Sequence, residues 1–159
     1  MIIDIYDNVL EDHVAEYIHL EMKKLSWKYD YHSNPKEPNF HWHILCGHNP
    51  KDVIGNGYEW LLPIWDAAKI KYKFEEKYNV DDFVRLYMNA HTHGIEPHIH
   101  LDDGDFTMIY YPRLDWKLEW GGGTFVYDEE KTKVEKLAEY KGNRLIVFDA
   151  WRPHQAQSV

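Results

Sequence analysis

Three side chains with metal-binding chemistry alternate in the second half of the chain. His98, His100 and Asp102 stand at positions i, i+2 and i+4. An extended segment would point all three side chains to one side. Imidazole and carboxylate groups are common ligands of divalent metals. The spacing therefore indicates a metal site, and the alternative for His-x-Asp taken alone is a turn that precedes a strand.

His154 adds a candidate ligand from a distant part of the chain, beyond a predicted strand over residues 145–149. Any two of the alternating residues could share a metal with it. Two imidazoles and one carboxylate on one face of a metal form the facial triad of non-haem Fe(II) oxygenases. Such a triad leaves three coordination positions open, two for a chelating cosubstrate and one for O₂.

The composition of the chain excludes several classes of protein. With 159 residues, 44% hydrophobic and 16% aromatic, it can fold as one domain and is not a disordered chain. A net charge of −9 argues against a nucleic-acid partner. The single cysteine, Cys46, excludes an intrachain disulfide and suits a reducing compartment. The sequence shows neither a signal peptide nor a membrane span, so we expect a cytoplasmic protein without a membrane partner.

Hydrophobic periodicity predicts helices first and strands afterwards. Helical spacing of apolar residues predicts helices over 11–25 and 57–78. Turn-prone Asn34-Pro35 and Glu37-Pro38 separate two aromatic-rich strands. The predicted strands cover residues 2–6, 26–32, 39–46, 83–90, 106–111, 123–127, 133–138, 143–148 and 154–159. This order is typical of an α+β protein in which helices pack on one face of a β-sandwich or small barrel.

The motifs after residue 83 follow one another in a recognisable order. His-Leu-Asp at 100–102 precedes Phe-Thr-Met-Ile-Tyr-Tyr-Pro at 106–112 and Trp-Gly-Gly-Gly-Thr-Phe at 120–125. Gly-Asn-Arg-Leu-Ile-Val-Phe-Asp at 142–149 and Pro-His at 153–154 come next. This ordered set resembles the 2-oxoglutarate- and Fe(II)-dependent dioxygenase superfamily, in particular its prolyl-hydroxylase-like branch.

The resemblance implies a double-stranded β-helix, or jelly roll, in a single oxygenase domain over residues 1–159. Residues 1–80 would give helical and β support, and 81–159 would form the jelly-roll core with the metal site. By position, His100, Asp102 and His154 would bind Fe(II), and Tyr110 would line the 2-oxoglutarate pocket.

The family activity implies hydroxylation of an unactivated C–H bond, coupled to the conversion of 2-oxoglutarate and O₂ into succinate and CO₂. Ascorbate is a candidate reductant for such an enzyme. The branch suggests a peptidyl proline or another amino-acid residue as the substrate, and a small molecule is the alternative.

Two positions depart from the family pattern. Gly123 stands where the family's Gly-Gly-Glu-Thr turn has Glu. The family also places a basic residue shortly after its distal histidine to pair with 2-oxoglutarate, a position beyond Val159. Arg85 is the first internal candidate for this pairing, because strand alternation puts it on the same side as Tyr87 and Asn89, and Arg144 is the second.

Two rival functions fit part of the pattern. Gly94-x-x-x-His98-x-His100 resembles the start of a cupin metal motif, so a cupin-type metal protein would use His98 and His100. The other rival is a jelly-roll binding domain without catalytic activity. His91 and His93 are candidates to contact substrate or orient the metal ligands. The remaining histidines are expected to be structural or on the surface: His13, His19, His32, His41, His43 and His48.

Overall fold

A computed structural model describes residues 3–32, 36 and 39–159, so the predicted turns at Asn34-Pro35 and Glu37-Pro38 lie outside the described residues. The first half of the chain mixes strands and helices, and the second half consists mainly of strands. The first half contains β1 (Ile3–Asp7), α1 (Asp12–Met22), β2 (Lys28–Tyr31), β3 (His41–Gly47), α2 (Pro50–Gly55), the 3₁₀ turn η1 (Glu59–Leu61), α3 (Leu62–Tyr72) and α4 (Phe74–Tyr78). The second half contains β4 (Leu86–Ala90), β5 (Phe106–Tyr111), the 3₁₀ turn η2 (Leu118–Trp120), β6 (Thr124–Tyr127), β7 (Val134–Ala138), β8 (Arg144–Asp149) and β9 (His154–Ala156).

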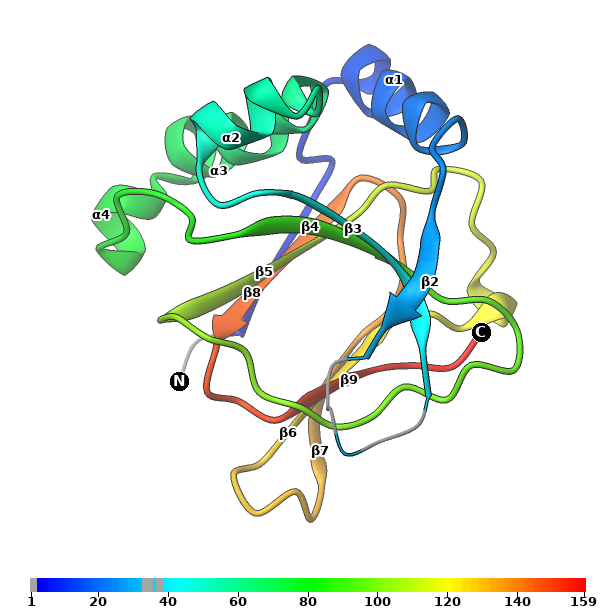
Figure 1. Cartoon of the computed structure of the whole chain (residues 1–159). Helices are drawn as coiled ribbons and strands as arrows, with labels where there is room; N and C mark the ends of the chain where they lie inside the picture. Colours follow the sequence, from blue (N-terminus) through cyan, green and yellow to red (C-terminus); the bar gives the residue numbers. More distant parts are fainter. Residues whose placement is uncertain (1–2, 33–35, 37–38) are drawn as a thin grey trace.

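The described strands form three antiparallel sheets of three strands each. Their orders are β1-β8-β5, β2-β3-β4 and β7-β6-β9. Figure 1 shows α1, α2, α3 and α4 together on one side of the molecule, with β6, β7 and β9 on the opposite side. The sheet that contains β5 and β8 runs between these layers (Figure 1). The protein is therefore a mixed α and β structure with helices gathered on one face, as the sequence predicts.

Strand β8 separates two hydrophobic cores. Leu145 and Val147 pack into the core beneath the helices, whereas Ile146 and Phe148 pack into a second core with Val126 of β6. This division follows from strand geometry, because successive side chains point to opposite faces. These four side chains of β8 are almost completely buried. The second core ends at Phe148, whose ring makes an edge contact with the His154 ring at 4.8 Å between centroids.

The prediction of one continuous helix over 57–78 is wrong. The structure divides it into η1, α3 and α4, with a break at Lys73, whose backbone is left-handed (φ 53°). Periodicity also missed α2, although its signals are present: Pro50 occupies the first turn, and the Asn49 side chain accepts a hydrogen bond from the Asp52 N–H. The strand predicted from residue 83 begins at Leu86. Among the described residues, none of the helices has the length and apolar character that a membrane crossing requires.

The glycine turn before β6 explains the departure at Gly123. Gly121 and Gly122 have φ of 68° and 79°, a region that side chains strongly disfavour. A Cβ atom at Gly123 would lie 2.5 Å from the carbonyl oxygen of Ala138. Because β6 pairs with β7 at this point, with Thr124 opposite Ala138, the family's Glu would displace that strand. The turn therefore needs glycine at all three positions.

Asn143 ties the start of the chain to β8. Its side chain accepts hydrogen bonds from the Leu10 N–H (2.9 Å) and the Tyr110 hydroxyl (3.1 Å), and it donates one to the Leu10 carbonyl (2.9 Å). The residue is buried and its backbone is left-handed (φ 60°), a conformation that asparagine tolerates better than most residues. One side chain therefore satisfies three buried polar groups at the junction of β1, α1 and β8.

We predict that Asn143→Ala lowers the free energy of unfolding by about 3 kcal/mol, because it removes three hydrogen bonds worth about 1 kcal/mol each. Asn143→Gly removes the same bonds but accepts the left-handed backbone, so its loss should be smaller. Urea unfolding of both variants measures the two values. A loss below about 1 kcal/mol for the alanine variant would show that this junction is not a stabilising element.

Candidate metal centre

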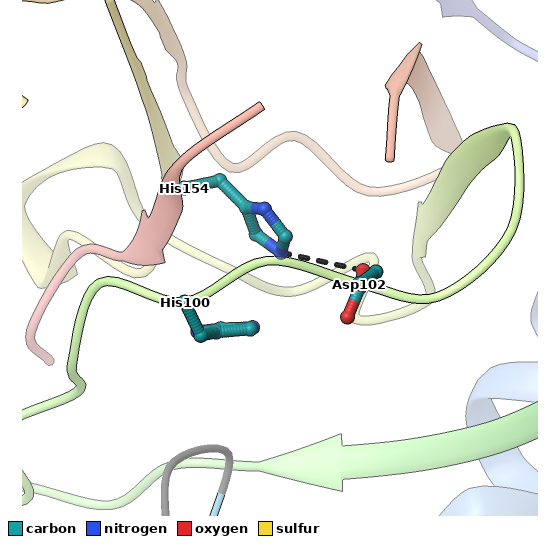
Figure 2. Close-up of side chains that lie close together, drawn as sticks. All are labelled: His100, Asp102 and His154. Atoms are coloured by element: carbon teal, nitrogen blue, oxygen red, sulfur yellow. Dashed lines mark ion pairs between the residues drawn. The ribbon is translucent and has the colours of Figure 1, made fainter. Parts of the chain in front are cut away.

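His100, Asp102 and His154 converge, as Figure 2 shows. One ligand atom from each side chain lies within 4.8 Å of the others, and this is the only such cluster of three or more His, Cys, Asp or Glu groups in the described residues. His100 and Asp102 come from the loop between β4 and β5, and His154 is the first residue of β9. The structure thus brings together the three residues that the sequence pattern selected.

Backbone hydrogen bonds join the two segments that carry the cluster. The His100 and His154 N–H groups each donate to the other's carbonyl at 3.0 Å. The Asp102 N–H donates to the carbonyl of Ala150 at 3.1 Å, and the Ala150 N–H donates to that of Asp105 at 3.0 Å. The segment around residues 100–105 is therefore held along the β8–β9 connection, and the side chains inherit a fixed spacing.

The two imidazole rings are oriented by their own neighbouring backbone. Nδ1 of His100 lies 2.9 Å from the His98 carbonyl oxygen, and Nδ1 of His154 lies 2.9 Å from the Arg152 carbonyl oxygen. A carbonyl oxygen only accepts, so each Nδ1 carries a proton, and in the neutral form of the ring Nε2 is the atom with a lone pair for a metal. A hydrogen bond of this kind from the remote ring nitrogen is common at protein metal sites. Both rings are thus prepared to bind a cation through Nε2.

Asp102 supplies the negative charge of the cluster. Its Oδ2 atom lies 3.3 Å from Nε2 of His154 and accepts a 2.7 Å hydrogen bond from the Thr107 hydroxyl. Burial would raise the pKa of Asp102, but the interactions with His154 and Thr107 lower it to about 2. Burial, followed by the nearby His154, lowers the pKa of His100. A carboxylate beside a neutral imidazole is the state that binds a divalent metal, so the donor set fits such an ion.

A cavity of about 570 Å³ adjoins the cluster. It lies between β4 and β5, each the outer strand of its sheet in the described part of the chain. Successive residues of both strands line it, from Arg85 to His91 and from Phe106 to Arg113. The cavity therefore reaches from the helix-side core to the metal ligands, and it has the size of a small-molecule site.

Arg85, Tyr87 and Asn89 all line this cavity. The Arg85 guanidinium lies over the Tyr87 ring at 5.0 Å, and Asn89 is hydrogen-bonded to His43 at 2.7 Å. Burial, followed by the Asp102 charge, raises the pKa of Tyr87 to about 12. This phenol is therefore a neutral hydrogen-bonding group at physiological pH, and Arg85 is a cation beside it.

Tyr110 and Arg144 are placed differently from Arg85. Tyr110 packs with the helix-side core and bonds Asn143, on the opposite face of β5 from Thr107, although part of it borders the cavity. Tyr111 shares the Thr107 face, and its hydroxyl lies 2.8 Å from that of Thr124. Arg144 makes two hydrogen bonds to the Asp7 carboxylate, at 2.6 and 3.1 Å. A role for Tyr110 in cosubstrate binding stays a prediction.

Two of the remaining histidines of the motif line the cavity, and the third contacts the backbone of Val159. His98 and His91 line the cavity, and His93 Nδ1 lies 3.2 Å from the Val159 carbonyl oxygen. Two residues of the site were not predicted from the sequence. Thr107 donates a hydrogen bond to Asp102, and His41 is buried and lines the cavity. Thr107 had a usable signal, because it follows Asp102 closely at the start of a predicted strand. His41 had only the alternation with His43, which strand residues often show.

The fold is similar to that of two solved prolyl hydroxylases, in line with the resemblance seen in the sequence. A prolyl-4-hydroxylase from Pseudomonas putida superimposes with a TM-score of 0.67 at 13% identity, over 97% of this chain and 84% of that one. A prolyl hydroxylase from Trichoplax adhaerens, solved with a hypoxia-inducible-factor peptide fragment, gives 0.60 at 13% identity, over 98% and 77%. No protein-family model and no curated protein sequence matches the chain.

We predict that Asp102→Ala and His154→Ala each weaken Zn²⁺ binding by more than about 100-fold. Removal of a residue that only hydrogen-bonds a metal ligand costs up to about 100-fold, and removal of a ligand itself should cost more. His98→Ala is the matched control, because His98 lines the same cavity but does not belong to the three-residue cluster. Calorimetric titration with Zn²⁺ gives the affinities. Loss of binding in His98→Ala, with binding retained in Asp102→Ala, would favour the cupin-type ligand set.

We also predict that the metal-free protein loses stability as the pH falls from 6.5 to 4. Burial, followed by the neighbouring His91, lowers the pKa of His41 to about 4, whereas an unfolded chain titrates near 6.5. Between these values the unfolded chain binds a proton that the folded chain does not, so the free energy of unfolding rises with pH. His41→Phe should remove about 2 kcal/mol of this dependence in urea titrations. An unchanged slope would contradict the assignment.

Proposed function

We propose that this protein is an Fe(II)- and 2-oxoglutarate-dependent dioxygenase that hydroxylates an unactivated C–H bond. The observation that carries the proposal is the cluster of His100, Asp102 and His154 beside a cavity of about 570 Å³. The two prolyl hydroxylases of similar fold support it. We further infer a jelly-roll core over residues 81–159, in which the β7-β6-β9 sheet faces β5 and β8, with residues 1–80, including β1, as support.

In this proposal, His100 and His154 bind Fe(II) through Nε2, and Asp102 binds it through its carboxylate. A metal held by these residues would supply the activation of O₂ needed to oxidise 2-oxoglutarate and the substrate. Thr107 keeps one Asp102 oxygen in place through its 2.7 Å hydrogen bond. The reciprocal backbone bonds of His100 and His154 hold the two ring ligands on neighbouring segments of the chain. The protein thus fixes three ligands and leaves the other coordination positions for small molecules.

The residues of β4 form the side of the cavity at which we propose that 2-oxoglutarate binds. The Arg85 guanidinium offers charge-assisted hydrogen bonds to the distal carboxylate of 2-oxoglutarate. Tyr87 adds a neutral hydroxyl, and Asn89 adds an amide. Arg85 is favoured over Arg144 because the Arg144 guanidinium already pairs with the Asp7 carboxylate. Ascorbate would act as a reductant from solution.

A peptidyl proline or another amino-acid residue is the proposed substrate. The Trichoplax enzyme of similar fold was solved with a peptide fragment, which supports a peptide as the primary substrate here. Two alternatives have their own tests. A cupin-type protein would depend on His98 and His100 for metal binding, and a jelly-roll binding domain would bind metal without turnover.

We predict that the Fe(II)-loaded protein forms succinate from 2-oxoglutarate and O₂, even without a primary substrate. Asp102→Ala should abolish this reaction because it removes the only carboxylate of the metal cluster. Anaerobic loading, followed by timed exposure to air and quantification of succinate, measures the rate. Iron binding in the parent protein with no succinate above the Asp102→Ala background would favour the non-catalytic binding domain.

We predict that Arg85→Gln raises the KM for 2-oxoglutarate by at least about tenfold, the loss expected for hydrogen bonds to a charged group. Arg144→Gln is the matched control, because it removes an arginine that pairs with Asp7 instead. Steady-state succinate formation at varied 2-oxoglutarate gives both constants. A raised KM in Arg144→Gln alone would transfer the anchoring role to Arg144.

A further inference from the structure

His41 carries a polar atom that the described structure leaves without a partner. The side chain lies on β3, only 6% of the residue is exposed, and its Nε2 atom has no hydrogen bond to any described residue. Buried polar atoms in folded proteins nearly always have a partner. A buried imidazole with one unsatisfied nitrogen therefore points to a ligand that the protein is built to receive.

The ring of His41 is held in position by its neighbours. Tyr31 of β2 makes an edge contact with it at 5.3 Å between centroids, and His91 makes another at 4.9 Å. Extending the β3–β4 pairing by one position beyond the Trp42–Ala90 pair places His41 opposite His91. The two imidazoles thus form a small wall, with His41 on β3 and His91 directly after β4.

This wall borders the same cavity as the metal ligands. His41 and His91 line it together with His100, Asp102 and His154. His100 contributes to the lowered pKa of both rings, which places the wall within electrostatic range of the cluster. A molecule that occupies this cavity beside the cluster can therefore contact the two imidazoles.

The wall is suited to an uncharged polar group. Burial lowers the pKa of His41 and of His91 to about 4, so both rings are neutral at physiological pH. A neutral imidazole offers one donor and one acceptor, which match the C=O and N–H groups of an amide. A carboxylate would be better matched by the Arg85 cation elsewhere in the cavity.

We propose that His41, supported by His91, binds a backbone amide of a peptide substrate and positions it beside the metal cluster. This inference rests on the proposed function and specifies its substrate class: a peptide whose amide groups are uncharged, rather than a free amino acid. His41 is thus a substrate-positioning residue, and it takes no part in holding the metal.

The test uses the Zn²⁺-loaded protein with 2-oxoglutarate, labelled with ¹⁵N in its histidine rings. We expect the blocked peptide acetyl-Ala-Pro-Ala-amide to shift the His41 and His91 ring resonances, and free L-proline to leave them in place. His41→Phe should weaken peptide binding by at least about fivefold, the value of one hydrogen bond. His41→Gln, which restores a polar nitrogen, should recover part of the loss.

His13→Phe is the control, because His13 is an exposed histidine on α1 that does not line the cavity. It should bind the peptide as the parent protein does. Unchanged Zn²⁺ affinity in His41→Phe shows that the variant is folded. The inference is overturned if His41→Phe binds the peptide normally, if the parent protein does not bind it, or if L-proline shifts the same resonances. Succinate formation by the parent protein separates these outcomes from failure of the oxygenase assignment itself.

Discussion

The reciprocal pair of backbone hydrogen bonds between His100 and His154 is the contact on which the proposed centre depends. It joins two segments more than fifty residues apart in the chain at the point where both carry an imidazole. Asp102 is then positioned by its own N–H bond to Ala150 and by the Thr107 hydroxyl. Because these bonds are made by the backbone and by one neighbouring side chain, the spacing of the ligands does not require a bound metal.

The surroundings of His154 explain why this pairing is rigid. Arg152, two residues earlier, is 2% exposed and pairs with Glu135 of β7 at 2.8 Å. The Arg152 carbonyl oxygen in turn accepts the hydrogen bond that orients the His154 ring. On the other side, the Phe148 ring packs against His154 at the end of the second core. The ion pair of a buried arginine and a buried aromatic ring thus orient the His154 ring and its Nε2 atom.

Much of this arrangement could be predicted from the sequence, because local patterns carry it. The alternation of His98, His100 and Asp102 indicated a metal site, and the family resemblance then selected His100, Asp102 and His154 as its ligands. The strand pattern of β8 follows directly from its apolar run. Most of what could not be predicted depends on contacts between distant segments. The left-handed break at Lys73 is a local departure that periodicity does not report. The burial of His41 depends on how β2, β3 and the β4–β5 loop meet, and the face occupied by Tyr110 depends on the register of β5.

The most direct test of the central claim is the position of the metal itself. Crystals loaded anaerobically with Fe(II) and 2-oxoglutarate should give one strong anomalous peak at the iron edge. The account predicts that this peak lies within about 2.2 Å of Nε2 of His100, Nε2 of His154 and a carboxylate oxygen of Asp102, as at other protein metal centres. A peak coordinated by His98 without Asp102, or no peak at the cluster, would contradict it.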